Sequence, residues 1–247
     1  MIAYQTMVDD DGYQVALFPL ESFVISQADT ETYSHNPSVY WATDYLAYNT
    51  SGQRIYRADC YAPVDLKLLW MDRSYPVAVW ESLDKVHLAN GVLDYLTVLV
   101  YHDNDIYNGL YNVGDIKLQG EVFNKTGTMN HGSTVGDHVH LETGRGRYKK
   151  SYSTSSGTAE YKYHITNYTT VKRLHNYDAL FINDTIPRHT SQYPTEYPWK
   201  TFEGGHPSPS PFSTRYRFKW VLYRNKKIRN KWDLSLIWQV FFIMIYK

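Results

Sequence analysis

The sequence predicts a mainly β protein with few or no long helices, and three observations support this fold class. Short apolar runs alternate with Gly, Asn, Asp and Pro along most of the chain. No long stretch has the 3.6-residue periodicity of an amphipathic helix. Tyrosine is abundant, with 24 tyrosines among 247 residues, and tyrosine is common in β-sheets. A tyrosine-rich surface also suits extended polymer ligands such as glycans or peptides.

The predicted strands follow a short polar lead-in over residues 1–14. Apolar and β-branched runs predict strands at residues 15–18, 23–25, 45–48, 66–70, 77–80 and 95–101. A Gly114-Asp115 turn separates two further short strands within residues 112–122. Residues 136–144 predict one more strand, because apolar Val139 and Leu141 alternate with polar neighbours.

Composition shifts divide the chain into four parts. Residues 15–186 form the predicted domain, with a core at 15–145, an exposed loop at 145–158 and accessory strands at 160–186. Residues 187–213 carry most of the prolines and predict an extended linker. Residues 214–247 begin with a basic stretch and end in an apolar run that is too short to span a bilayer comfortably. We interpret this tail as truncated or out of frame; docking on the domain or on a membrane surface are the alternatives.

Charge, cysteine content and the first residues of the chain bear on the expected partners and cellular compartment. The chain has 25 basic and 25 acidic residues, which gives no electrostatic argument for a nucleic-acid partner. Cys60 is the sole cysteine, so no intrachain disulfide can form, as in proteins that fold in a reducing cytoplasm. The first ten residues lack the basic and apolar regions of a signal peptide. We therefore expect synthesis in the cytoplasm, no stable membrane insertion and a monomer.

The pair His138-Val139-His140 is the most informative pattern in the sequence. Alternate side chains of a strand share one face, so both imidazoles project to the same side. Two adjacent imidazoles suit a metal ion, or a metal ligand beside an acid–base group. In an arbitrary sequence, such a pair is more often two exposed histidines. Here the neighbouring residues are rich in glycine and threonine, which indicates tight turns that lead into a short strand.

A hydrolytic zinc ion needs about three protein ligands and one open position. The pair supplies at most two of these, so the remaining ligands must come from elsewhere. His35 in a polar loop and Asp44 at the start of a strand-like run are the best candidates, and His102 ends the most apolar predicted strand. Taken alone, His35 reads as a surface histidine, Asp44 as a turn carboxylate and His102 equally as a structural residue.

Several segments together resemble the lysostaphin-type (LytM-like) zinc endopeptidases of bacterial cell-wall metabolism. Residues 113–122 read VGDIKLQGEV and residues 132–142 read GSTVGDHVHLE, similar to the family patterns V-x-x-G-D-x-V-x-x-G-x-x-I and G-x-x-G-x-S-T-G-x-H-L-H-F-E. Upstream, residues 61–65 (YAPVD) resemble the A-P-x-D-G turn, and residues 96–102 (LTVLVYH) resemble the V-x-Y-x-H strand. The resemblance covers roughly residues 15–145, with the motifs in family order.

The resemblance implies a fold, a cofactor and residue roles. The fold is an antiparallel β-sheet sandwich, the barrel-sandwich hybrid of the family, and the cofactor is one zinc ion per chain. His35, Asp44 and His140 match the metal ligands. His102 and His138 match the two histidines that flank the zinc-bound water as general base and transition-state stabiliser. Glu142 is either a residue that orients a ligand histidine or an exposed carboxylate on the strand.

The sequence departs from the family pattern at a few positions. Eight residues separate His35 from Asp44, where about three are common, and the glycine expected after Asp65 is absent. Asp137 stands where proline is common, and Val139 replaces leucine. Three further histidines are interpreted as loop or polar surface: His131, His164 and His175.

Three functions remain open at this point. The first is a zinc peptidoglycan endopeptidase that cuts stem peptides or cross-bridges, a phage lysin that is released by a holin or carried on the virion and acts at the bacterial cell wall. The second is a catalytically inactive relative that serves as a cell-wall binding or structural module. The third is a sugar-phosphotransferase component, a related fold with paired histidines that has no need of Asp44 or zinc. The suitable residues at all five positions favour the first.

Overall fold

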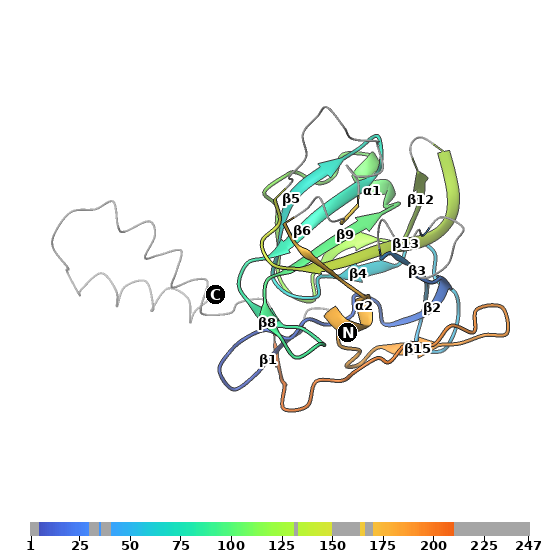
Figure 1. Cartoon of the computed structure of the whole chain (residues 1–247). Coiled ribbons are helices and arrows are strands. Elements are labelled where there is room, and N and C mark those ends of the chain that lie inside the picture. The colour runs from blue at the N-terminus through green and yellow to red at the C-terminus, as the bar shows by residue number, and fades with distance from the viewer. Residues whose placement is uncertain are drawn as a thin grey trace, which may run out of the picture. The chain divides into compact units, whose positions relative to one another are not determined.

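The longest strand, β13 (Ser133–Arg145), lies in the middle of a ten-stranded sheet and organises the fold. It pairs antiparallel with β9 (Leu96–Tyr101) on one side and with β3 (Thr43–Tyr48) on the other. The computed structural model describes residues 5–29, 35, 41–130, 133–149, 164–165 and 170–209. Figure 1 shows β13 beside β9, and β6 and β5 follow on the other side of β9.

The remaining strands extend this sheet or form small two-stranded sheets beside it. The sheet order is β10-β5-β6-β9-β13-β3-β2-β15, and β12 and β14 also pair with β13. The new members are β10 (Ile116–Lys117), β5 (Leu66–Asp72), β6 (Val77–Ser82), β2 (Ser22–Gln27), β15 (Ile186–Arg188), β12 (Gly127–Asn130) and β14 (Lys172–Leu174). The small sheets are β1 (Gln5–Val8) with β16 (His206–Pro209), β4 (Asp59–Tyr61) with β11 (Val122–Lys125), and β7 (Val86–His87) with β8 (Leu93–Asp94).

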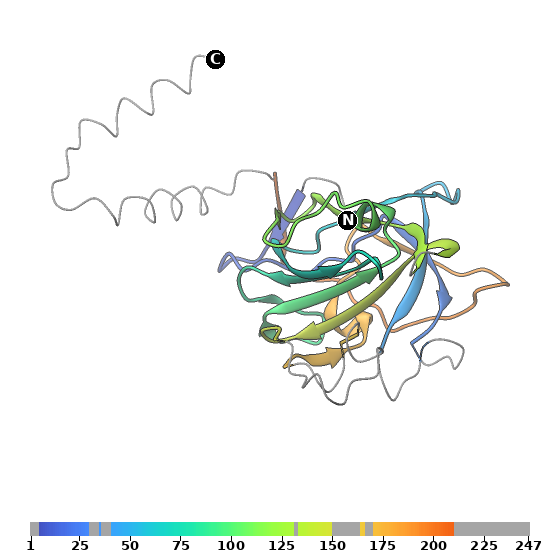
Figure 2. The ribbon, with the colours of Figure 1, turned by 90° about the horizontal axis from the view of Figure 1, so that it is seen from above.

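The predicted fold class is confirmed at the level of a mainly β, largely antiparallel protein. Only two short helices occur among the described residues, α1 (Asn104–Tyr107) and α2 (Asn176–Ala179). One pairing, β15 with β2, is parallel. In Figure 2 the strands coloured teal through yellow-green, from β6 to β13, run side by side as one layer.

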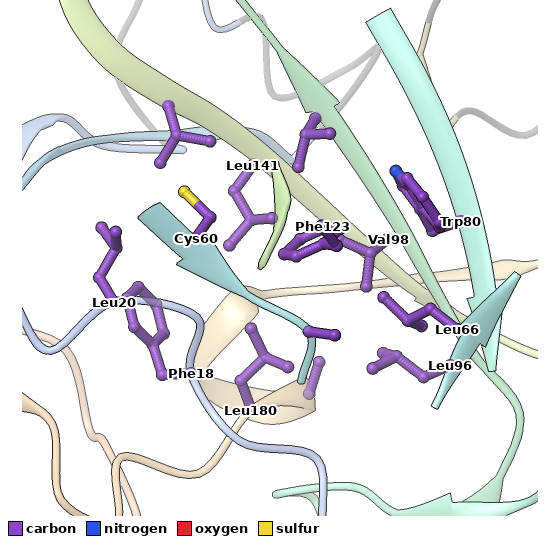
Figure 3. Close-up of a cluster of buried hydrophobic side chains, with 14 of the residues drawn as sticks. Phe18, Leu20, Cys60, Leu66, Trp80, Leu96, Val98, Phe123, Leu141 and Leu180 are labelled. Atoms are coloured by element: carbon purple, nitrogen blue, oxygen red, sulfur yellow. The ribbon is translucent and has the colours of Figure 1, made fainter. Parts of the chain in front are cut away.

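Alternation along the central strands separates two apolar clusters on the two faces of the sheet. On β9, Val98 and Val100 belong to the main core, whereas Leu99 and Tyr101 belong to a second cluster. This follows from the two-residue period of a strand. Figure 3 shows Val98 and Leu141 in the main core together with side chains such as Phe123 and Trp80. The second cluster includes Ile165, which lies far from β9 in the sequence.

Two predicted strands and one predicted boundary differ from the structure. Residues 112–113, which precede the Gly114-Asp115 turn, lie outside any strand, and within residues 112–122 only β10 and the start of β11 follow this turn. Residues 15–18 make isolated bridges, Val15 to His87 and Leu17 to Phe181, in place of a continuous strand. Their alternate side chains are buried in two different clusters, which explains the strand-like apolar pattern.

The proline-rich segment also differs from the extended linker that its composition predicts. Ile186–Arg188 pairs with β2, and His206–Pro209 pairs with Gln5–Val8 of the predicted lead-in. Between them, Trp199 makes edge-to-face contacts with core residues Phe18 and Phe23, at ring-centroid distances of 5.2 and 5.4 Å. Proline is compatible with such edge positions, because an edge strand does not need every backbone donor.

Some expectations fall on residues that the structure does not describe. These are His131, residues 150–158 of the predicted loop, residues 160–163 and 166–169 of the predicted accessory strands, and the whole basic and apolar tail from residue 214. Within the described part of the chain, no helix combines the length and apolar character needed to cross a membrane.

Replacing Trp199 with alanine tests whether the proline-rich segment contributes to the stability of the domain. We expect W199A to lower the free energy of unfolding by about 2 kcal/mol, because a half-buried indole loses its contacts with two core aromatic rings. Urea denaturation followed by circular dichroism measures this change. Exposed Glu196 in the same segment is the control, and E196A should leave stability unchanged. Equal midpoints for W199A and wild type would show that the segment behaves as a linker.

Candidate metal centre

The centre is built on one face of β13. His138, His140 and Glu142 alternate along the strand and share this face, while Val139 and Leu141 pack into the main core on the other. His140 pairs directly with Asp44 on β3 and with Tyr101 on β9. The register of three neighbouring strands therefore sets the carboxylate of Asp44 against the imidazole of His140.

His35, Asp44 and His140 come together around a single carboxylate oxygen. Oδ1 of Asp44 lies 3.2 Å from Nε2 of His35 and 3.1 Å from Nδ1 of His140. All three residues are buried, with exposed fractions of 1%, 8% and 7% respectively. His35 and Asp44 therefore lie close together, as the resemblance implies, although the segment between them is longer than in the family pattern.

The hydrogen bonds of the two histidines decide which nitrogens face Asp44. Nδ1 of His35 lies 3.1 Å from the carbonyl oxygen of Ala28, and Nε2 of His140 lies 3.0 Å from Oε1 of Glu142. Both partners can only accept, so these nitrogens carry the protons in the neutral rings. The opposite nitrogens then direct their lone pairs at Oδ1 of Asp44. Three acceptors that converge in a buried site require a positive charge among them.

The pKa values express the same requirement for positive charge. Burial alone would raise the pKa of Asp44, but the adjoining imidazoles of His140 and His35 favour its ionised form and hold this pKa far below its usual range. Burial would lower the pKa of His140, yet hydrogen bonds to Asp44 and Glu142 raise it to about 9. Without a metal ion, His140 therefore takes up a proton, and a bound cation satisfies the same carboxylate in its place.

The donor set fits zinc in type and in spacing. Two imidazole nitrogens and one carboxylate oxygen are common zinc ligands, and three protein ligands leave a fourth position open. Zinc–ligand distances near 2.0–2.1 Å at tetrahedral angles place neighbouring ligand atoms about 3.3 Å apart. The two nitrogen–oxygen distances at Asp44 are within 0.2 Å of this value. All three ligand atoms lie within 4.8 Å of one another.

His102 and His138 lie beside these three residues. Their ring centroids are 4.4 Å apart, and the ring of His102 is 6.0 Å from that of His140. Nε2 of His138 is 3.5 Å from Oδ2 of Asp44. The sequence-predicted residues, His35, Asp44, His102, His138 and His140, thus form one cluster.

His102 is held as a neutral imidazole. Burial lowers its pKa to about 3, and the positive charges that His138 and His140 can carry act in the same direction. Its Nδ1 donates to the carbonyl oxygen of Met129 at 2.9 Å, which leaves the lone pair on Nε2. His138 is oriented similarly, with Nδ1 at 2.6 Å from the carbonyl oxygen of Gly136. Both rings therefore present an unprotonated Nε2 when neutral.

The backbone at His102 is strained and firmly held. Its φ of 78° lies in the left-handed region that residues with a side chain rarely adopt. The amide of His102 donates to Pro76, and its carbonyl accepts from Met129. Gly127 makes this approach possible, because a Cβ there would lie 1.9 Å from the carbonyl oxygen of His102. Such strain persists only where the surrounding structure enforces it.

A buried aspartate fixes the segment that follows His102. The side chain of Asp103 caps helix α1 by accepting from the amide of Asp105. It also accepts from the amide of Lys125 at 2.8 Å and from the guanidinium of Arg57 at 2.9 Å. The amide of Arg57 in turn donates to Asp137 on β13. This network ties the loop after β9 to the strand that carries His138.

Two of the histidines assigned to polar surface have partners inside the fold. His164 bonds through Nδ1 to Glu142, and only 15% of its side chain is exposed. His175 bonds to Asp29, a residue that is 2% exposed, and its ring stacks on Trp41 and on Tyr177. The surface interpretation is wrong for His164. The sequence gives no local signal for it, since its partner is 22 residues away.

Glu142 is buried, which excludes the interpretation of an exposed strand carboxylate. It accepts from Nε2 of His140 and from the amide of Ile165, in addition to His164. Burial alone would raise its pKa, but the charge of His164 and the bonds from both histidines lower it to about 2. The carboxylate is therefore ionised and orients His140.

The fold and this site define a mainly β protein with a buried centre of two histidines and one aspartate suited to a divalent metal ion. No protein-family model matches the chain. The chain is similar to "Morphogenesis protein 1" of Bacillus phage B103, with 28% identity over 177 residues. The match covers 70% of this chain and 41% of that protein, so the chain spans about two fifths of the length of its relative. The similarity supports a bacteriophage origin.

Replacing Gly127 with alanine tests the close approach at His102. We expect G127A to lower the free energy of unfolding by about 2 kcal/mol, since its methyl group would overlap the His102 carbonyl group and force the backbone to move. Urea denaturation measures the loss. Gly136 provides the matched control, because a Cβ there meets no atom within 4 Å. Similar destabilisation by G136A and G127A would contradict this explanation.

Proposed function

We propose that this chain is a zinc-dependent peptidoglycan endopeptidase that hydrolyses peptide bonds of cell-wall stem peptides or cross-bridges. The observation that carries the proposal is the convergence of two imidazole lone pairs on one buried carboxylate oxygen, in the residues that match the metal ligands of the lysostaphin-type family. His102 and His138 beside this centre match the family's two other histidines. The mainly β fold is compatible with the family's barrel-sandwich hybrid.

His35, Asp44 and His140 would hold the zinc ion through Nε2, Oδ1 and Nδ1. When bound at a site with an open fourth position, zinc acts as a Lewis acid that polarises a carbonyl group and lowers the pKa of water to about 7. The burial of all three residues restricts competing water and strengthens their electrostatic interactions.

The two neighbouring histidines would move and hold protons. The Nε2 lone pair of His102 can accept a proton from the attacking water, because Nδ1 of this ring already donates to the carbonyl oxygen of Met129. Once protonated, His102 or His138 can donate a hydrogen bond from Nε2 to the developing oxyanion, or a proton to the leaving amine. The bonds from each Nδ1 to a backbone carbonyl keep both rings in this orientation.

The substrate and the biological setting follow from two separate arguments. The resemblance of the sequence motifs to cell-wall endopeptidases supports peptidoglycan as the substrate. The similarity to a phage protein named for morphogenesis supports a component carried on the virion over a freely released lysin. In either setting the chain would be made in the host cytoplasm and act at the bacterial cell wall, without nucleic acid as a partner.

Metal analysis combined with clearing of cell walls tests the proposal. We expect about one zinc ion per chain, and loss of turbidity when the protein is added to a panel of purified walls. H140A should lose both zinc and clearing, since it removes a ligand. H102A should keep its zinc but clear walls at least ~100-fold more slowly, because general acid–base catalysis contributes about that much or more.

Exposed His189 provides the control, and H189A should match the wild type in both measurements. Stoichiometric zinc without clearing of any wall would favour the alternative, a catalytically inactive relative that acts as a cell-wall binding or structural module. Retention of zinc by H140A would exclude the metal centre described above.

A further inference from the structure

We infer that His164 is a positioning residue of the metal centre, which acts on the zinc ligand His140 through the carboxylate of Glu142. This inference rests on the proposed function, because it assigns His140 to the metal. It extends the centre beyond the predicted core at residues 15–145, to a segment that the sequence motifs do not reach. The evidence is a chain of hydrogen bonds that is buried and directional.

Glu142 receives three donors from two separate segments. Nε2 of His140 lies 3.0 Å from Oε1, and Nδ1 of His164 bonds to the same oxygen. The backbone amide of Ile165 donates to Oε2 at 2.7 Å. Since Glu142 is only 1% exposed, water cannot take the place of these donors. A buried carboxylate that loses a donor becomes costly to keep ionised.

The bond from His140 to Glu142 selects the tautomer that the metal needs. A proton on Nε2 of His140 places the ring's lone pair on Nδ1, the nitrogen that faces Asp44. An ionised Glu142 also makes the imidazole a stronger ligand, as in other carboxylate–histidine–zinc arrangements. His164 supports this only indirectly, by holding the acceptor oxygen of Glu142 in place.

Tertiary packing places His164 beside the site. Ile165 is buried on the same face of the sheet as His140, in the cluster that contains Val79, Leu99 and Tyr101. The rings of Tyr101, His140 and His164 form a triangle, with centroid distances of 5.0 Å from Tyr101 to His140, 5.5 Å from Tyr101 to His164 and 5.8 Å between the two histidines. The buried isoleucine therefore anchors the adjacent histidine to the face that carries the metal ligands.

The group His140, Glu142 and His164 also has the composition of a second metal site. The geometry favours the hydrogen-bonded arrangement. Nε2 of His140 needs its proton when Nδ1 binds a metal, so it cannot bind another cation without losing that proton. Both histidine nitrogens lie within hydrogen-bond reach of Oε1 of Glu142.

Zinc affinity of the full chain tests the inference, measured by competition with a chromophoric chelator. We expect H164A to weaken zinc binding by about 10- to 100-fold, the range typical for residues that orient metal ligands. H164N places an amide N–H where Nδ1 of the histidine lies, and should stay within about 3-fold of wild type. In an E142A background, adding H164A should cause no further loss, because the effect passes through Glu142.

His87, which pairs with Asp9 elsewhere in the fold, is the matched control. H87A should bind zinc like the wild type, and melting curves of the zinc-free variants verify that each is folded. Equal affinity of H164A and wild type, or equal weakening in H164A and H164N, would overturn the inference. A second zinc ion that H164A alone loses would assign these residues to a metal site of their own. If H140A binds zinc normally, the proposed centre itself fails, which separates the two conclusions.

Discussion

The structure depends on a buried carboxylate that faces two imidazole lone pairs. Oδ1 of Asp44 cannot donate a hydrogen bond, and neither can the nitrogens of His35 and His140 that face it in their neutral forms. Burying these acceptors together is unfavourable unless a proton or a cation lies among them. In the metal-free protein, the raised pKa of His140 means that this ring takes up a proton and so supplies the positive charge. A divalent ion meets the same need with three ligands at once.

The scaffold supplies this arrangement through strand register. Asp44 and His140 are direct partners on β3 and β13, and the pairing of His140 with Tyr101 places the end of β9 beside them. His102 follows directly after β9 and is turned toward the site by a left-handed backbone that Gly127 permits. A slip of one residue along β13 would turn both histidines into the apolar core. The large apolar core on the opposite face, shown in part in Figure 3, resists such a slip.

Local patterns predict much of this fold and part of the candidate site. The alternation at residues 138–142 is enough to place His138 and His140 on one face, and the apolar run at residues 96–101 predicts β9. The convergence of His35 and Asp44 with them follows only from the family resemblance, because eight residues and a pairing between distant strands separate these elements.

His164 could not be found from local sequence patterns. Its role depends on the burial of Ile165 among residues more than sixty positions upstream. Composition likewise does not reveal the packing of the proline-rich segment, since Trp199 contacts Phe18 and Phe23 only in the folded chain.

The central claim is that one divalent ion lies among His35, Asp44 and His140. Anomalous diffraction at the zinc absorption edge, from crystals of the zinc-loaded protein, tests this claim most directly. We expect one strong peak about 2.0–2.2 Å from Nε2 of His35, a carboxylate oxygen of Asp44 and Nδ1 of His140. A peak elsewhere, or zinc bound to His140 through Nε2 with Glu142 turned away, would contradict it.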